Sequence, residues 1–220
     1  QSRVQLDLHG YLESRNRLRT TDSEFISTRQ RLWLEGQGGY GAVGALGAQP
    51  PLRGFVSGAV DVDPMAADLS DDHDTARIYL EEAFLTVDRP GYNAVVGRKI
   101  HRIGTGDGIN PMDLINPLDY RDPFATGSSD ARLPVLLGLA TINLPVWGPF
   151  QEGNLDMIVV PLAQVNELNS PGSAWEGPGL RELRAGHDEG HYILEDQEEP
   201  NQVFDQAEYE VRLAATLYNW

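Results

Sequence analysis

Apolar and polar residues alternate along most of this chain, in runs near ten residues long. A period of two places neighbouring side chains on opposite faces of a β-strand, whereas the spacing of an amphipathic helix hardly occurs here. The first run shows the pattern, with one side apolar or glycine and the other polar: Val4, Leu6, Leu8, Gly10 and Leu12 against Gln5, Asp7, His9, Tyr11 and Glu13. The pattern predicts an all-β chain.

Eight such runs predict eight antiparallel strands. We expect them at residues 3–20, 24–36, 53–63, 77–88, 93–103, 133–144, 154–162 and 207–220. Long acidic loops at 63–76, 104–132 and 163–206 alternate with turn-like or small-residue connections, of which the Gly-rich 36–54 stretch is unusually long. Connection 20–23 is short where the alternation calls for a long one. Short turns at one end and long loops at the other are typical of an outer-membrane barrel, so we predict a single transmembrane β-barrel unit over residues 1–220.

The two faces also favour a barrel over a soluble β-sandwich. A sandwich packs large aliphatic and aromatic groups inward and presents a polar face outward. Here the apolar face is made of Val, Leu, Ala and Gly, and ionisable groups stand in mid-strand on the other face, as a wet lumen permits. The facing of the fourth and fifth strands stays open, because Glu81-Glu82 and Arg98-Lys99 place charge on both faces. A soluble envelope β-sandwich that binds a ligand stays the alternative.

Composition excludes several classes of function. The net charge of −16 argues against a nucleic-acid partner, which needs a basic face. The absence of cysteine excludes a disulfide framework, a thiolate metal site and a cysteine nucleophile. No apolar run is long enough for a membrane helix, and if the protein is exported, Gln1 is expected near the mature N-terminus. Neither Ser128-Ser129 nor the His187 to His191 spacing fits a catalytic or zinc motif, so we expect no enzyme.

The loop after the fifth strand holds a repeated phrase. Residues 109–114 read Ile-Asn-Pro-Met-Asp-Leu and residues 115–120 read Ile-Asn-Pro-Leu-Asp-Tyr. Each Asn-Pro step disfavours helix, so the loop is expected to follow a defined path. We interpret it as a constriction loop folded into a lumen, with these polar residues along it: Asp107, Asn110, Asp113, Asn116, Asp119 and Asp122.

Two other interpretations of this loop stay open. Carboxylate oxygens are the ligands that Ca²⁺ prefers, which makes Asp107, Asp113 and Asp119 weak candidates, although the spacing is not that of an EF-hand. Asn and Asp near proline are also what ordinary turn chemistry selects, so a capped surface loop is the third interpretation. No cofactor is expected beyond this weak calcium candidate.

Charged side chains are expected to line the lumen opposite the loop. They are Arg29, Arg31, Glu82, Arg98 and Arg102. A basic ladder facing an acidic loop creates a transverse field that orients dipolar solutes and sets ion preference. Equally, these arginines and carboxylates can neutralise one another within the wall.

Four sequence motifs, in their order along the chain, resemble those of a known protein family. They are Tyr79 to Leu85, Val96-Gly97-Arg98-Lys99, Gly104 to Phe124 and Arg132-Leu133-Pro134. Over about residues 1–162 the chain is similar to the N-terminal part of a large, poorly characterised family of Gram-negative outer-membrane β-barrel proteins. The resemblance implies a porin-like channel or exporter, associated with other envelope transport proteins, and brings no catalytic residue. Such barrels have well over eight strands, so we expect part of a larger barrel, with a closed eight-stranded barrel as the alternative.

Three functions are therefore carried forward. The first is a channel or exporter for a small solute in the outer membrane of a Gram-negative bacterium, with the 104–124 loop as its constriction. The second is a barrel that sheathes a partner protein. The third is the soluble binding protein. Acidic outer loops such as 188–205 are expected to be solvated, or at most to collect cations that bridge lipopolysaccharide phosphates.

Overall fold

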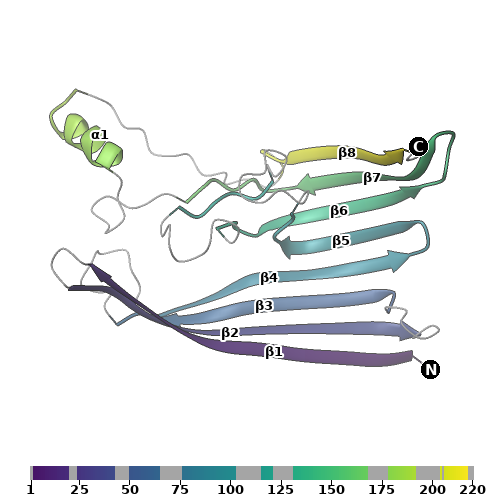
Figure 1. The fold of residues 1–220 in the computed structure, drawn as a ribbon, viewed down its shortest axis with the longest axis horizontal. Coiled ribbons are helices and arrows are strands. Elements are labelled where there is room, and N and C mark those ends of the chain that lie inside the picture. Colours follow the sequence, from purple (N-terminus) through teal and green to yellow (C-terminus); the bar gives the residue numbers. More distant parts are fainter. Residues whose placement is uncertain are drawn as a thin grey trace.

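The chain forms one antiparallel sheet of eight strands in sequence order, with one short helix (Figure 1). The computed structural model describes residues 2–19, 24–42, 50–64, 76–102, 115–120, 131–167, 178–191, 204 and 206–217. The strands are β1 Ser2–Arg19, β2 Glu24–Ala42, β3 Leu52–Val62, β4 Ala76–Arg89, β5 Tyr92–Lys99, β6 Val135–Leu144, β7 Phe150–Val160 and β8 Glu208–Leu217; the helix is α1 Pro178–Asp188. The predicted all-β class, the antiparallel order and the number of strands are confirmed.

The connections divide the sheet into two distinct ends. Segments 20–23, 63–75, 100–134 and 161–207 leave from one end, called here the long-loop end. Segments 43–51, 90–91 and 145–149 leave from the opposite turn end, where both chain termini also lie (Figure 1). The predicted alternation of long and short connections therefore holds except at 20–23, the short connection already noted in the sequence. Within the described residues, the outer edges of β1 and β8 pair with no other strand, and the sheet is open.

Strand β2 is longer than predicted. The Gly-rich residues after Gly36 continue the ladder to Ala42, paired with β1 on one side and β3 on the other. Proline packing explains two of these glycines, because a Cβ on Gly39 would lie 2.2 Å from Cγ of Pro50, and Gly41 has φ 144° beside Pro51. Glycine removes the apolar–polar pattern but not the backbone hydrogen bonds, so the prediction of a connection from residue 36 was wrong.

Other boundaries differ by a few residues. Strand β5 ends at Lys99 rather than residue 103, and β7 begins at Phe150, directly after the Gly148-Pro149 turn. The helix α1 was not predicted, and it lies within the long acidic loop. Pro178 stands at its first position, and its end is closed by Gly190 at φ 78°, with the His191 amide donating to the Gly186 carbonyl. These are ordinary helix start and stop signals. No helix among the described residues is long and apolar enough to cross a membrane.

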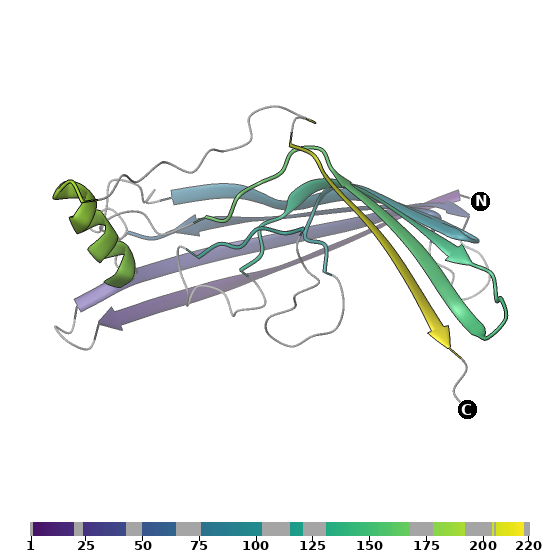
Figure 2. The same ribbon diagram turned by 90° about the horizontal axis from the view of Figure 1, so that it is seen from above.

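The sheet has one apolar and one polar face, in register across all eight strands. Cross-strand partners on the apolar face include Leu8 with Gly36, Gly36 with Val56, and Leu155 with Leu213. The sheet curves into a trough, and segments 115–120 and 131–134 lie on its inner side (Figure 2). They pack on the polar face, which is therefore the concave one. We call the other the convex face.

A β-bulge settles the facing of the fourth strand. Ser57 pairs with Glu82 and Gly58 with Leu80, so Glu81 is an extra residue on β4. Before the bulge Tyr79 is concave, and after it Glu82 is concave. In β5 the concave charge is Lys99. Arg98 was expected to line the lumen, and this prediction was wrong. Its cross-strand partners Ala83 and Leu136 belong to the convex face, so Arg98 has a convex position.

The buried core is small and lies at the long-loop end of the concave face. Its members come from β6, β7 and the segment after β5: Ile115, Val135, Leu137, Ile158 and Val160, with Leu139 packed against them. The concave face of these strands is thus apolar where the 115–120 segment covers it and polar elsewhere. This packing holds the loop against the inside of the trough.

Candidate functional site

The concave face is the candidate functional site, because it gathers the charged side chains of the sheet. Along β1 and β2 the register pairs Glu13 with Arg31 and Arg15 with Arg29. Next to them along the same face, the rings of Tyr11 and Trp33 stack with centroids 6.2 Å apart. Ionisable and aromatic groups thus follow the trough in the direction of its strands.

Asp61 of β3 is the principal anion at the long-loop end. Arg31 donates to both its carboxylate oxygens, through Nε and Nη2 at 2.7 Å each. This planar two-bond arrangement is the strong form of an arginine–carboxylate pair. Arg29 lies farther away, with Nη1 3.9 Å from Asp61 Oδ2, and the Arg31 guanidinium stands 5.7 Å from the centre of the Tyr79 ring. The two predicted lumen charges Arg29 and Arg31 are therefore together on the concave face.

Glu82 and Lys99 form a second charged group nearer the middle strands. The Lys99 ammonium lies 4.0 Å from a Glu82 oxygen and 4.0 Å from the centre of the Phe84 ring. Glu82 also accepts a 2.9 Å hydrogen bond from the Ile100 amide, which ties the end of β5 to β4. Glu82, one of the residues predicted to be a lumen charge, thus lies on the same face as Arg29 and Arg31.

The two remaining predicted lumen arginines lie elsewhere. Arg98 donates from Nε to the Glu81 carbonyl at 3.1 Å, at the long-loop end of β5. Arg102 is exposed beyond the end of that strand.

Asp156 organises the other wall of the trough. It is only 5% exposed and accepts hydrogen bonds from Thr141 Oγ1 at 2.7 Å and from Arg212 at 2.9 and 2.5 Å. The Asn154 amide lies 3.4 Å from both its oxygens. A carboxylate with this many donors is held rigidly, and it links β6, β7 and β8 in one polar network. The prediction of lumen charges did not include Asp156 or Arg212, although both stand at polar positions of alternating strands.

The second copy of the repeated phrase is fixed to the concave side by Asn116. This side chain is 5% exposed. Its Oδ1 accepts from the His101 amide at 2.9 Å, and its Nδ2 donates to the Leu133 carbonyl at 2.8 Å. The side chain predicted to line a constriction therefore serves to hold the loop, because its polar atoms are used by the main chain on both sides.

Main-chain bonds extend this attachment. The Leu133 amide donates to the Pro117 carbonyl, and the Asp119 amide to the Ala131 carbonyl. On the other side, the Glu167 amide donates to the Leu118 carbonyl and the Tyr120 amide to the Glu167 carbonyl. Segment 115–120 thus lies between the approach to β6 and the chain leaving β7. Asp119 is half-buried in this arrangement.

The other predicted loop residues, Asp107, Asn110, Asp113 and Asp122, lie outside the described residues. Two of the three weak calcium candidates are among them. Across the described part of the chain, no group of three or more His, Asp or Glu side chains is placed to hold a metal ion.

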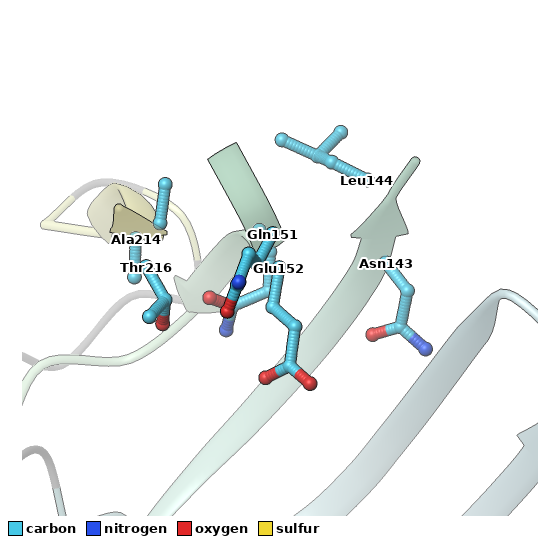
Figure 3. Close-up of a pocket in the computed structure, with 9 residues that line it drawn as sticks. Asn143, Leu144, Gln151, Glu152, Ala214 and Thr216 are labelled. Atoms are coloured by element: carbon cyan, nitrogen blue, oxygen red, sulfur yellow. The ribbon is translucent and has the colours of Figure 1, made fainter. Parts of the chain in front are cut away.

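A polar depression lies at the turn end of β6, β7 and β8. Asn143 and Glu152 extend to the same side there, whereas Leu144 points to the opposite side (Figure 3). Ala214 and Thr216 border the depression from β8. Glu152 is its one ionisable lining residue, so it offers little chemistry of its own.

Comparison of the chain with models of known protein families, with curated proteins and with solved structures finds no match.

Proposed function

We propose that this chain forms part of the wall of an outer-membrane β-barrel, a porin-like channel or exporter of a Gram-negative bacterium. The observation that carries the proposal is the convex face, which is apolar and exposed on every strand. Leu12 is 83% exposed, Ile78 82% and Tyr209 72%. Water disfavours so large an apolar surface, whereas lipid tails accept it. Each strand contributes at least one such side chain: Leu8, Leu34, Val56, Ile78, Val96, Leu136, Met157 and Leu213.

The height of this apolar surface suits a membrane. On β2 the convex positions are apolar or glycine from Leu32 to Tyr40, close to the roughly 9–11 residues of a transmembrane strand. Toward the long-loop end the surface becomes polar, where Gln30 donates to Ser14 Oγ at 2.9 Å. At the turn end Tyr40, Tyr92 and Trp147 are exposed. Aromatic residues of this kind favour the boundary between lipid tails and headgroups.

A soluble β-sandwich fits these faces less well. In a sandwich the apolar face is covered by a second sheet, and the face that carries the charges meets solvent. Among the described residues nothing covers the convex face, and the covering segment 115–120 lies on the charged face instead. The polarity of the two faces is therefore opposite to that of a sandwich, which supports the membrane proposal.

The concave face is proposed to line the passage. At the long-loop end it carries the Arg31–Asp61 pair on one wall and the clamped segment 115–120 on the other. A segment fixed inside a barrel narrows it, and fixed charges across from it set a preference among solutes. This arrangement supports a constriction formed by the loop, as the repeated phrase suggested.

The complete wall is proposed to contain more than eight strands. An eight-stranded barrel has an interior just wide enough for its own side chains. Here the trough also holds Ile115, Asn116 and Pro117, all buried against it. We infer that further strands pair with the edges of β1 and β8.

Detergent partition tests the membrane proposal first. The chain is expected to enter the detergent-rich phase on phase separation, and recovery in the aqueous phase would support the soluble alternative. The full-length protein in planar bilayers then tests the passage: discrete conductance steps support a channel. Conductance only after a partner protein is added would instead favour the sheath.

A further inference from the structure

Four arginines gather on two adjacent strands at the long-loop end of the concave face. They are Arg15 and Arg17 of β1 and Arg29 and Arg31 of β2. The chain as a whole has a net charge of −16, so this concentration of positive charge is local. The register places Arg15 directly opposite Arg29. Like charges directly across a strand pair destabilise a sheet, so the pair needs a compensating anion.

The carboxylates nearby are already engaged. Asp61 is bound through both oxygens by Arg31. Glu13 accepts from Nε and Nη2 of Arg15. The third, Asp63, accepts from the Ser27 hydroxyl at 2.5 Å and the Thr28 amide at 3.0 Å.

In the opposed pair of Arg15 and Arg29, each guanidinium group keeps one nitrogen without an acceptor. Arg15 Nη1 and Arg29 Nη2 are buried and have no hydrogen-bond partner among the described residues. The Arg29 side chain is 18% exposed, and its ion-pair partner among the described residues, Asp61, has its oxygen 3.9 Å away. A buried charged donor without an acceptor is costly, and such groups in native proteins usually meet a partner.

We propose that Arg15 and Arg29 together bind an oxyanion, the carboxylate or phosphate group of a solute within the trough. Two guanidinium groups on directly opposed residues offer several N–H donors, which match the geometry of carboxylate and phosphate oxygens. One anion between them supplies the missing acceptors and separates two like charges. The solute reaches the site from the concave side, because Arg15 and Arg29 both stand on that face.

The site selects anionic solutes for the proposed passage, so this inference rests on the proposed function. It stands at the long-loop end, on the wall of the trough formed by the first strands, while segment 115–120 covers the wall of β6 and β7. An anionic solute meets the arginines at the mouth before it passes along the trough. Binding itself requires no closed barrel and no conductance.

Thermal unfolding of the detergent-refolded chain tests the site, with inorganic phosphate as the probe and sodium chloride at equal ionic strength as the reference. An anion that binds the folded state raises Tm in a saturable way. Phosphate is expected to raise the Tm of the wild type by several degrees beyond chloride. Arg29→Gln is expected to abolish this rise. Arg53→Gln, the matched control, removes an arginine of the same face that pairs with Asp88 at the turn end and stands opposite Gly39 and Thr86 rather than another arginine. This variant is expected to keep the rise.

A second comparison, of stability without anions, distinguishes anion binding by Arg29 from a purely structural role of its side chain. In anion-free buffer Arg29→Gln is expected to be at least as stable as the wild type, because the substitution relieves repulsion with Arg15. The order of stability should then reverse as phosphate is added. An equal phosphate response in the wild type and Arg29→Gln, or a lower Tm of the variant without anions, would overturn the proposal. Anion binding needs no channel, so a negative result in this experiment would not contradict the membrane proposal. Conversely, recovery of the chain in the aqueous phase on detergent partition would not contradict the anion site.

Discussion

Asn116 Nδ2 donates a 2.8 Å hydrogen bond to the Leu133 carbonyl, while its Oδ1 accepts from the His101 amide. One side chain thereby joins the end of β5, the loop and the approach to β6. Since this side chain is buried, its polar bonds have no competition from water. The position of the loop inside the trough depends on this contact and on Ile115.

Replacing Asn116 by alanine is expected to loosen the loop. The His101 amide and Leu133 carbonyl lose their partner, at a cost of about 1–3 kcal/mol for buried polar groups. Denaturant unfolding measures the loss, and limited proteolysis within 103–130 should become faster. Asn143→Ala, at an exposed position of the turn end, is the control and should change neither. Equal behaviour of the two variants would show that Asn116 is not a clamp.

The Asp156–Arg212 pair is expected to stabilise the junction of β7 and β8. Asp156 is buried and Arg212 about one-third exposed, so removing the carboxylate leaves a partly screened cation and an unpaired Thr141 hydroxyl. We expect Asp156→Ala to cost about 1–3 kcal/mol. A double-mutant cycle with Arg212→Ala isolates the pair, with a coupling of about 0.5–3 kcal/mol. A coupling energy indistinguishable from zero would mean that the two side chains act independently.

Disulfide trapping tests whether the sheet closes on itself. The chain has no cysteine, so introduced pairs can be read directly. Cysteines at Leu12 and Leu32, which are cross-strand partners of β1 and β2, should form a disulfide. Cysteine at Leu8 combined in turn with Val211, Leu213 or Ala215 should form none within one chain if, as proposed above, further strands pair with the edges of β1 and β8. An intramolecular disulfide in any of these three variants would support an eight-stranded barrel.

A charge on the convex face should impair membrane insertion. Leu34 lies within the apolar band of β2, and Leu34→Lys is expected to cost about 2–4 kcal/mol, as for lysine near the bilayer midplane. Glu35→Lys changes the adjacent, concave residue and should have a small effect on folding into lipid vesicles. Similar folding yields for the two variants would contradict the assignment of lipid-facing positions.

Much of the fold followed from the period-two pattern. It identified eight strands and the long-loop and turn ends, because alternation reports directly which side chains share a face. It failed after Gly36, where glycines carry no apolar signal although their backbones continue the ladder. It also could not settle the facing of Glu81 and Glu82, because the bulge at Glu81 interrupts the alternation of β4 itself. In β5 the two charges Arg98 and Lys99 are consecutive, so residue type alone does not say which of them is concave.

The candidate site was less accessible from sequence. The repeated Asn-Pro phrase marked the loop, but the bonds of Asn116 reach main-chain groups 15 and 17 residues away, and residue type alone does not reveal them. The opposition of Arg15 and Arg29 likewise depends on the register of one hairpin. The start and stop signals around α1, in contrast, were present in the sequence.

The most direct measurement of the central claim is the depth-dependent quenching of single labels along β2. Each variant carries one cysteine with an environment-sensitive fluorophore, at residues 31 to 36 in turn, in vesicles of brominated lipid. We predict quenching by the bromines at Leu32, Leu34 and Gly36, and quenching by aqueous iodide at Arg31, Trp33 and Glu35. Equal access of iodide to both sets would contradict a convex face embedded in lipid.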